Sequence, residues 1–148
     1  MSKFQGNVSN VEIDVTTIVA NHNGERFIAD AIRSVSNQSL RGIEIIVSDD
    51  ASADASVHIV KSLKADDARI RLIESDVNAG PAAARNRALE VARGRWISVM
   101  DSDDLMHPDR LQLLIEVGAE RDADIVADDL LLFDTDRCTP PRTLFAGR

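Results

Sequence analysis

Short apolar runs alternate along this chain with segments whose apolar residues recur every three or four positions. Continuous runs rich in valine, isoleucine and threonine are typical of strands buried on both faces, whereas the longer spacing places apolar side chains on one stripe of a helix. The runs predict strands at residues 13–20, 43–47, 69–74, 96–100 and 123–127, with a further short one at 130–133. The helical spacing predicts helices at residues 25–35, 54–64, 82–93 and 108–118.

This alternation of strands and helices predicts an α/β fold. Helices that connect successive strands by right-handed crossovers give a mostly parallel sheet flanked by helices, a three-layer α/β/α arrangement. A chain of 148 residues fits one domain with a substantial core. We expect that domain at residues 13–134, between a flexible polar lead-in at residues 1–12 and an irregular polar tail at residues 135–148.

Composition narrows the class of partner. The net charge of −8 and the pI of about 4.8 argue against nucleic acid or an anionic membrane as the main partner. An anionic ligand must therefore be bound by a nearby positive group, which can be a metal, an arginine or a helix N-terminus. The single Cys138 excludes an intramolecular disulfide. No run is long enough to be a transmembrane segment, so we expect a cytoplasmic protein, peripheral to the inner face of the membrane at most.

Polar clusters follow the first four predicted strands, at residues 21–24, 49–50, 78–81 and 101–104. The carboxyl ends of parallel strands lie along one edge of a sheet, which is where open α/β folds bind their ligands. We therefore expect these four clusters to converge on one crevice.

The aspartates in two of these clusters are candidates for ligand contacts. Asp101 and Asp103 are two positions apart, so in an extended chain they point the same way and suit a hard cation such as Mg2+ or Mn2+. The alternative is a solvated acidic turn. Of Asp49 and Asp50, one is expected to face the crevice and the other to cap its own turn, and the alternative is that both only cap the next helix.

Basic and histidine side chains complete the candidates. Arg85 lies near the N-terminus of a predicted helix, a favourable place for an anion, whereas Arg87 is expected to pair with a surface carboxylate. His22 sits at the crevice edge, within reach of a ligand ring. His58 and His107 are expected to be structural.

Several chemistries lack their motifs here. No glycine-rich dinucleotide or P-loop signature is present, and no cysteine and histidine spacing indicates zinc. A flavodoxin-like phosphoacceptor domain would need an acidic pair after the first strand and a lysine after the fifth. The acidic clusters instead follow the second and fourth strands, which disfavours that class.

Four segments in order resemble the N-terminal, nucleotide-sugar-binding half of a family 2 glycosyltransferase with the GT-A (Rossmann-like) fold, over roughly residues 14–127. They are Val-Ala-Asn-His-Asn at 19–23, Glu-Ile-Ile-Val-Ser-Asp-Asp-Ala-Ser at 44–52, Asn-Ala-Gly-Pro-Ala-Ala-Ala-Arg-Asn at 78–86, and Met-Asp-Ser-Asp-Asp at 100–104. Three positions depart from the family pattern, with Ala20 and His22 where threonine and tyrosine are usual and Ala51 where glycine is usual.

The resemblance implies roles for individual residues. Asp50 would contact the base and Arg85 would lie near the base or the phosphates. Asp101 would face the ribose and the metal, and Asp103 would bind the metal, Mn2+ or Mg2+, that bridges the diphosphate. The implied substrate-binding residues are Asn21, His22, Asn23, Asp50, Arg85, Asp101 and Ser102, and the implied metal ligands are Asp101 and Asp103.

The resemblance also implies an activity: inverting transfer of a sugar from a nucleoside diphosphate sugar, expected to be a UDP-sugar, to a hydroxyl of a saccharide or lipid-linked acceptor, in polysaccharide or glycoconjugate synthesis. The carboxylate base belongs to a C-terminal half that we expect this chain to lack, so little transferase activity is expected of the chain alone. The alternative is a non-catalytic nucleotide-binding or interaction module. An apolar face left uncovered would favour a homo-oligomer.

Overall fold

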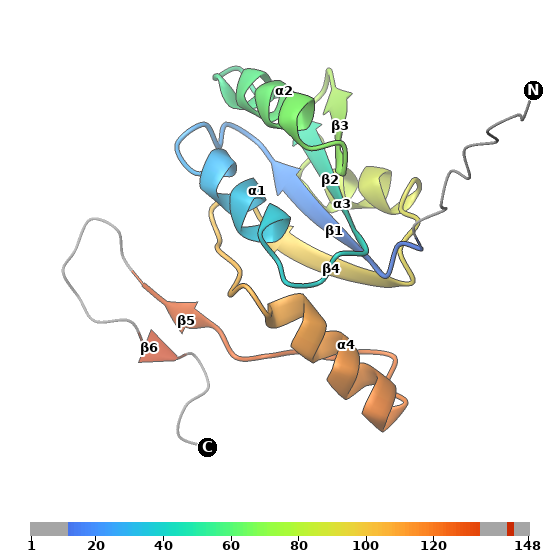
Figure 1. Cartoon of the computed structure of the whole chain (residues 1–148). Coiled ribbons are helices and arrows are strands. Elements are labelled where there is room, and N and C mark those ends of the chain that lie inside the picture. The colour runs from blue at the N-terminus through green and yellow to red at the C-terminus, as the bar shows by residue number, and fades with distance from the viewer. Residues whose placement is uncertain (1–11, 134–141, 144–148) are drawn as a thin grey trace, which may run out of the picture. The chain divides into compact units, whose positions relative to one another are not determined.

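The computed structural model describes residues 12–133 and 142–143 (Figure 1). They fall into two compact units, Met1–Gln112 and Leu113–Arg148. Most of the predicted lead-in lies outside the described residues, as do Cys138 and most of the predicted tail. No described helix is long and apolar enough to cross a membrane.

The first unit is built on a four-stranded parallel sheet in the order β3-β2-β1-β4. Its strands are β1 (Val15–Asn21), β2 (Ile43–Asp50), β3 (Ile70–Ser75) and β4 (Trp96–Asp101). The first four predicted strands are therefore confirmed, with ends that differ by at most three residues. The two central strands are buried along almost their whole length, as their continuous apolar runs predict.

Three helices cover this sheet: α1 (Ile28–Ser36), α2 (Ser56–Asp66) and α3 (Pro81–Leu89). α3 packs on β1 and β2, where Ala88 contacts the buried pair Ile18 and Ile46. The strand residues that alternate with Ile18 and Ile46 point to the opposite face of the sheet, which α1 and α2 cover (Figure 1). The predicted α/β/α layering is confirmed.

β4 is less well covered than its neighbours. Its Ile97 and Val99 are 40% and 52% exposed. Val99 pairs in register with Ile18, which places it on the face that α3 covers farther along the sheet. Ile97 and Val99 are thus exposed apolar residues of the kind that the prediction of a homo-oligomer assumes.

The chain runs into the second unit through α4 (Arg110–Arg121), which ends with a residue in the left-handed region, Asp122 at a φ of 48°. The predicted strand at residues 123–127 is wrong. The N–H of Ala123 turns back to the carbonyl of Gly118, and Ile125 is 87% exposed with no neighbouring strand in the described part of the chain. The predicted strand at 130–133 is β5 (Leu131–Leu132), which pairs antiparallel with β6 (Arg142–Thr143). β6 lies within residues 135–148, which were predicted to be irregular.

A buried carboxylate holds α3's far end to the sheet. Glu44 of β2 is 2% exposed and accepts hydrogen bonds from Thr16 Oγ1, Arg71 Nη1 and Arg93 Nε, each at 2.9 Å. Burial raises the pKa of Glu44, but the hydrogen bonds from Arg71, Arg93 and Thr16 outweigh it and hold the pKa below its ordinary value. The charged carboxylate thus links three strands to the segment after α3.

We predict that Glu44→Gln lowers the free energy of unfolding at neutral pH by about 2 kcal/mol, the scale of hydrogen bonds to a charged group. The pKa of Glu44 is lower in the folded state than in the unfolded state. Its contribution to the free energy of unfolding is therefore fully present above the unfolded-state pKa of 4.5 and is lost as the pH falls through the folded-state pKa. Urea unfolding at neutral pH and well below pH 4.5 should therefore show the gap between wild type and variant shrinking in acid.

The matched control is Glu74→Gln, which removes a half-exposed partner of Lys61. Its effect is expected to be small at either pH because exposed ion pairs contribute about 0–1 kcal/mol. A Glu44→Gln deficit that is the same at both pH values would contradict the charge-based explanation.

Candidate functional site

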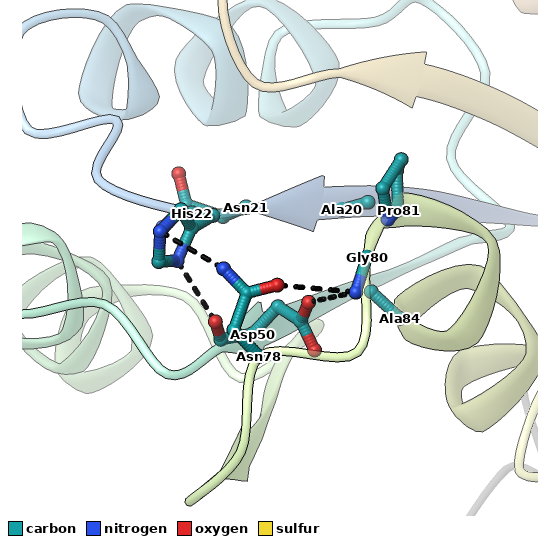
Figure 2. A pocket seen from close by; sticks show the side chains of 8 residues that line it. All are labelled: Ala20, Asn21, His22, Asp50, Asn78, Gly80, Pro81 and Ala84. Carbon is teal, nitrogen blue, oxygen red and sulfur yellow. Dashed lines mark hydrogen bonds between the residues drawn. The ribbon is translucent and has the colours of Figure 1, made fainter.

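A cavity of about 150 Å3 opens at the carboxyl edge of the sheet (Figure 2). It is lined by Ala20, Asn21, His22, Asp50, Asn78, Gly80, Pro81 and Ala84. These residues come from the ends of β1 and β2, the loop before α3, and α3 itself. The fourth polar cluster is adjacent, because Asp101 of β4 pairs in register with Ala20. The predicted convergence of polar clusters is therefore what the structure shows.

Asp50 fixes the loop before α3. Its carboxylate is 3% exposed, and Oδ1 accepts a hydrogen bond from Arg87 Nη2 at 2.6 Å. Oδ2 accepts from the backbone N–H groups of Ala79 at 2.9 Å and Gly80 at 2.6 Å. Gly80 has a φ of 87°, a conformation that favours glycine. The hydrogen bond from Arg87 lowers the pKa of Asp50 against the opposing effect of burial, and the two N–H groups lower it further.

Asp49 has the other role predicted for this pair, because it caps its own turn. Its Oδ1 accepts from the Ser52 N–H at 2.9 Å, and its Oδ2 accepts from Ser52 Oγ at 2.6 Å and from Asn21 Nδ2 at 2.8 Å. Ala51, within this turn, has a φ of 61°, so an alanine occupies a left-handed conformation. The remaining oxygen of Asn21, Oδ1, is buried without a hydrogen-bond partner in the described structure.

His22 forms a rigid wall of the cavity (Figure 2). Its Nδ1 lies 2.8 Å from the backbone carbonyl of Asp50, so Nδ1 carries the hydrogen and donates. Its Nε2 accepts from the side-chain amides of Asn23 and Asn78, each at 3.0 Å. The amide orientation of Asn78 is fixed because its oxygen accepts from the Gly80 N–H at 3.2 Å. These bonds select one neutral tautomer of the ring.

Gly24 lets the loop after β1 approach the acidic turn. A Cβ at this position would lie 2.3 Å from Asn21 Oδ1 and 3.2 Å from Ser102 Oγ, so a side chain is not tolerated without displacement. The same loop is held by hydrogen bonds from the Asn23 and Gly24 N–H groups to serine hydroxyls that precede α2 or begin it. Ser102 therefore lies close to the predicted ligand-binding residue Asn21.

The acidic turn after β4 gathers three carboxylates. Partial burial raises the pKa of Asp104, and the negative charges of Asp103 and Asp101 raise it further. A cation bound there would relieve this repulsion. No group of three or more His, Cys, Asp or Glu side chains that could hold a metal was found among the described residues. Asp101 and Asp103 could therefore hold Mg2+ or Mn2+ only together with oxygen ligands from outside the protein.

Two arginines of α3 reach the site carboxylates. Arg85 Nη2 forms an ion pair with Asp101 Oδ1, and Arg87 pairs with Asp50. The expectation that Arg87 pairs with a surface carboxylate is wrong, because its partner is nearly fully buried and lines the cavity. The Nε atoms of both arginines are buried without hydrogen-bond partners in the described structure, so each guanidinium retains an unused donor.

The structure places the predicted ligand residues in three positions. Asn21, His22 and Asp50 line the cavity, whereas Asn23 supports His22 from outside it. Arg85, Asp101, Ser102 and Asp103 lie at or beside the acidic turn. The sequence predicted that the polar cluster at residues 78–81 lies at this crevice, but Asn78, Gly80 and Pro81 were not assigned a ligand contact and Ala84 was not predicted.

The size of the cavity limits what it can hold. Pockets that enclose a drug-sized ligand measure roughly 300–1,000 Å3. A cavity of about 150 Å3 fits one ring system, and the rest of a larger ligand must extend along the surface. Arg85 and Asp101 offer charged groups beside the cavity for such an extension.

Comparison with known proteins gives a consistent result. The sequence model of glycosyl transferase family 2 matches residues 16–143. The succinoglycan biosynthesis protein ExoO of Rhizobium meliloti is 45% identical over 117 residues, which are 79% of this chain and 33% of that protein. The chain spans about two fifths or less of the length of such curated relatives.

Solved structures show the same fold. The mannosyltransferase PcManGT from Pyrobaculum calidifontis, in complex with GDP-Man and Mn2+, aligns with a TM-score of 0.69 and 26% identity, over 73% of this chain and 33% of that one. Staphylococcus aureus TarS 1–349, in complex with UDP-GlcNAc, aligns with a TM-score of 0.70 and 24% identity, over 86% of this chain and 37% of that one, a likeness of fold.

We predict that Ala51→Gly stabilises the protein. The left-handed φ of Ala51 is disfavoured for alanine, while glycine adopts it freely. After allowance for glycine's extra freedom in the unfolded chain, the free energy of unfolding should rise by up to about 1 kcal/mol. Chemical denaturation measures this. Ala53→Gly, in the same loop and without a positive φ, is the control and should not stabilise; equal gains from both would contradict a conformational cause.

We predict that Arg87→Met raises the pKa of Asp50 toward the ordinary aspartate value of 3.8. The hydrogen bond from Arg87 is the largest influence on that carboxyl, so its removal leaves burial less opposed. The side-chain carboxyl 13C shift of Asp50, followed by NMR during an acid titration, reports the change. Arg33→Met on the surface of α1 should leave the titration unaltered. An Asp50 curve unchanged by Arg87→Met would refute the assigned pairing.

Proposed function

The chain belongs to glycosyl transferase family 2, and from this premise we propose that its first unit binds the nucleoside diphosphate sugar donor of a glycosyltransferase reaction. The observation that carries the proposal is the arrangement at the carboxyl edge of the sheet. A cavity the size of one ring lies beside an arginine and a pair of carboxylates that suit a cation. A donor of this class has a base, a ribose, a diphosphate and a sugar in that order.

The base is assigned to the cavity. His22 and Asn78 form one wall and Pro81 and Ala84 belong to the α3 side, which together accommodate a flat ring. Both oxygens of Asp50 already accept hydrogen bonds, so any contact from Asp50 to the base would use a remaining lone pair. His22 replaces the tyrosine usual at this position, and it is a candidate for setting the preference between uracil and guanine.

The diphosphate and its metal are assigned to the acidic turn. Asp101 and Asp103 would hold Mn2+ or Mg2+, and Arg85 lies where it can meet phosphate oxygens. The cation, when bound, would offset the charge that develops on the departing nucleoside diphosphate. PcManGT, which aligns over 73% of this chain, was solved with GDP-Man and Mn2+, and this supports a metal-dependent site.

The transfer itself is proposed for the whole protein. In the proposed reaction a carboxylate base accepts the proton of an acceptor hydroxyl, which displaces the nucleotide with inversion at the sugar carbon. No described residue is assigned as that base. The relation to ExoO, named for succinoglycan biosynthesis, supports a saccharide or lipid-linked acceptor in polysaccharide synthesis.

The test is calorimetric titration of UDP, and separately of GDP, into the chain with and without Mn2+. We expect one of the two nucleotides to bind with a clear dependence on Mn2+. Asp103→Ala should abolish that dependence because it removes one of two carboxylate ligands. Asp30→Ala, an exposed aspartate on α1, should bind as the wild type does.

The outcomes separate two functions. Metal-dependent binding that is lost in Asp103→Ala supports the donor site. Binding that ignores both Mn2+ and the substitution would favour a nucleotide-binding module without transfer chemistry. If neither nucleotide binds the folded chain, the donor-site proposal fails.

A further inference from the structure

The ion pair between Arg85 and Asp101 places a protein cation on the carboxylate that we assign to a metal. Arg85 Nη2 contacts Asp101 Oδ1, and the two side chains are 34% and 56% exposed. Because the guanidinium already neutralises Asp101, a metal that binds this carboxylate competes with Arg85 for its negative charge. The structure therefore contains a competitor for the metal within the proposed site.

We propose that Arg85 competes with the metal for Asp101 and, once displaced, binds the diphosphate of the donor, so that Arg85 couples the binding of the two ligands. The inference rests on the proposed function, because it concerns the control of the same donor site. It makes Arg85 a residue with two alternative partners.

The chemistry of Arg85 fits both partners. A guanidinium presents five donors in a planar fork that matches carboxylate and phosphate oxygens equally well. One of those donors, Nε, is buried without a hydrogen-bond partner in the described structure. The present pairing with Asp101 therefore leaves part of its capacity unused.

The exchange is feasible because the present pair is exposed. A half-exposed ion pair contributes little to stability, since water solvates both charges when they separate. Arg87 provides the contrast within the same helix. Its partner Asp50 is 3% exposed and also holds the loop before α3, so this second pair is expected to persist when ligands bind.

The first experiment measures metal binding without nucleotide, from the electron paramagnetic resonance signal of free Mn2+. Arg85→Met keeps the aliphatic stem and removes the competitor, so it should bind Mn2+ about threefold more tightly than wild type, as expected for loss of an exposed ion pair. Arg33→Met removes the same charge from a surface pair on α1 and should leave the affinity unchanged. Arg85→Lys, which keeps the charge, should fall between the two.

The second experiment titrates the nucleotide that binds, UDP or GDP, at saturating Mn2+. Here Arg85→Met should bind about tenfold more weakly or worse, because a charge-assisted hydrogen bond to phosphate is lost. Circular dichroism and the thermal midpoint check that each variant is folded. Tighter metal binding combined with weaker nucleotide binding in one variant is the signature of a shared residue.

The third experiment removes the metal and compares Asp101→Asn with Asp103→Asn. Both delete one negative charge from the same turn, but Asp101→Asn alone weakens the hold on Arg85. Metal-free nucleotide binding should therefore be about threefold tighter in Asp101→Asn than in Asp103→Asn.

Each outcome decides something. Unchanged or weaker Mn2+ binding in Arg85→Met would show that Arg85 does not compete for Asp101, and equal nucleotide affinities in the two asparagine variants would show that it is not released. Either result overturns the proposal. If wild type binds neither UDP nor GDP, the proposed function and the diphosphate half fail together, while the Mn2+ titration still reports separately on competition at Asp101.

Discussion

The site depends on the ion pair between Asp50 and Arg87. Asp50 ends β2, Arg87 lies in α3, and the same carboxylate accepts the N–H groups of the loop that joins β3 to α3. A buried carboxylate is expensive unless it is paired and hydrogen-bonded, and here every bond it makes fixes part of the cavity wall. Removing the charge would free the loop, the helix start and the strand end together. The shape of the cavity is thus a consequence of satisfying one buried charge.

A second buried carboxylate on the same strand works at the other end of the helix. Glu44 and Asp50 are six residues apart on β2, so they point to the same face, and Ile46 between them packs on Ala88. Arg93, just beyond α3, binds Glu44 as Arg87 binds Asp50. The start of the helix is therefore held to β2 by the hydrogen bonds from the loop before it to Asp50, and its end is held by the apolar contact of Ala88 and by the two ion pairs. This explains how a helix rich in alanine, with little apolar side-chain area to bury, is held in a defined position.

The sequence predicted most of this fold and the location of the site. Continuous apolar runs indicated the central strands because β1 and β2 are buried on both faces, and the polar residues at their ends followed from parallel topology. The strand expected at residues 123–127 failed because an apolar run does not form a strand without a neighbour, and Ile125 faces solvent. Arg87 was misjudged because partner choice depends on which helix face meets which strand end, and spacing along the chain does not give that information.

The two arginines of α3 divide two tasks that sequence position alone would not separate. Arg87 pairs with a carboxylate that is almost inaccessible to solvent, so this ion pair stabilises the cavity wall. Arg85 pairs with a half-exposed carboxylate, so this ion pair contributes little to stability and can be broken at low cost. Because both project from one helix that is fixed to β2, the proposed movement of Arg85 between partners need not disturb the cavity. In the proposed donor site, a rigid support beside an exchangeable contact would allow a charged ligand to bind without reorganising the sheet edge.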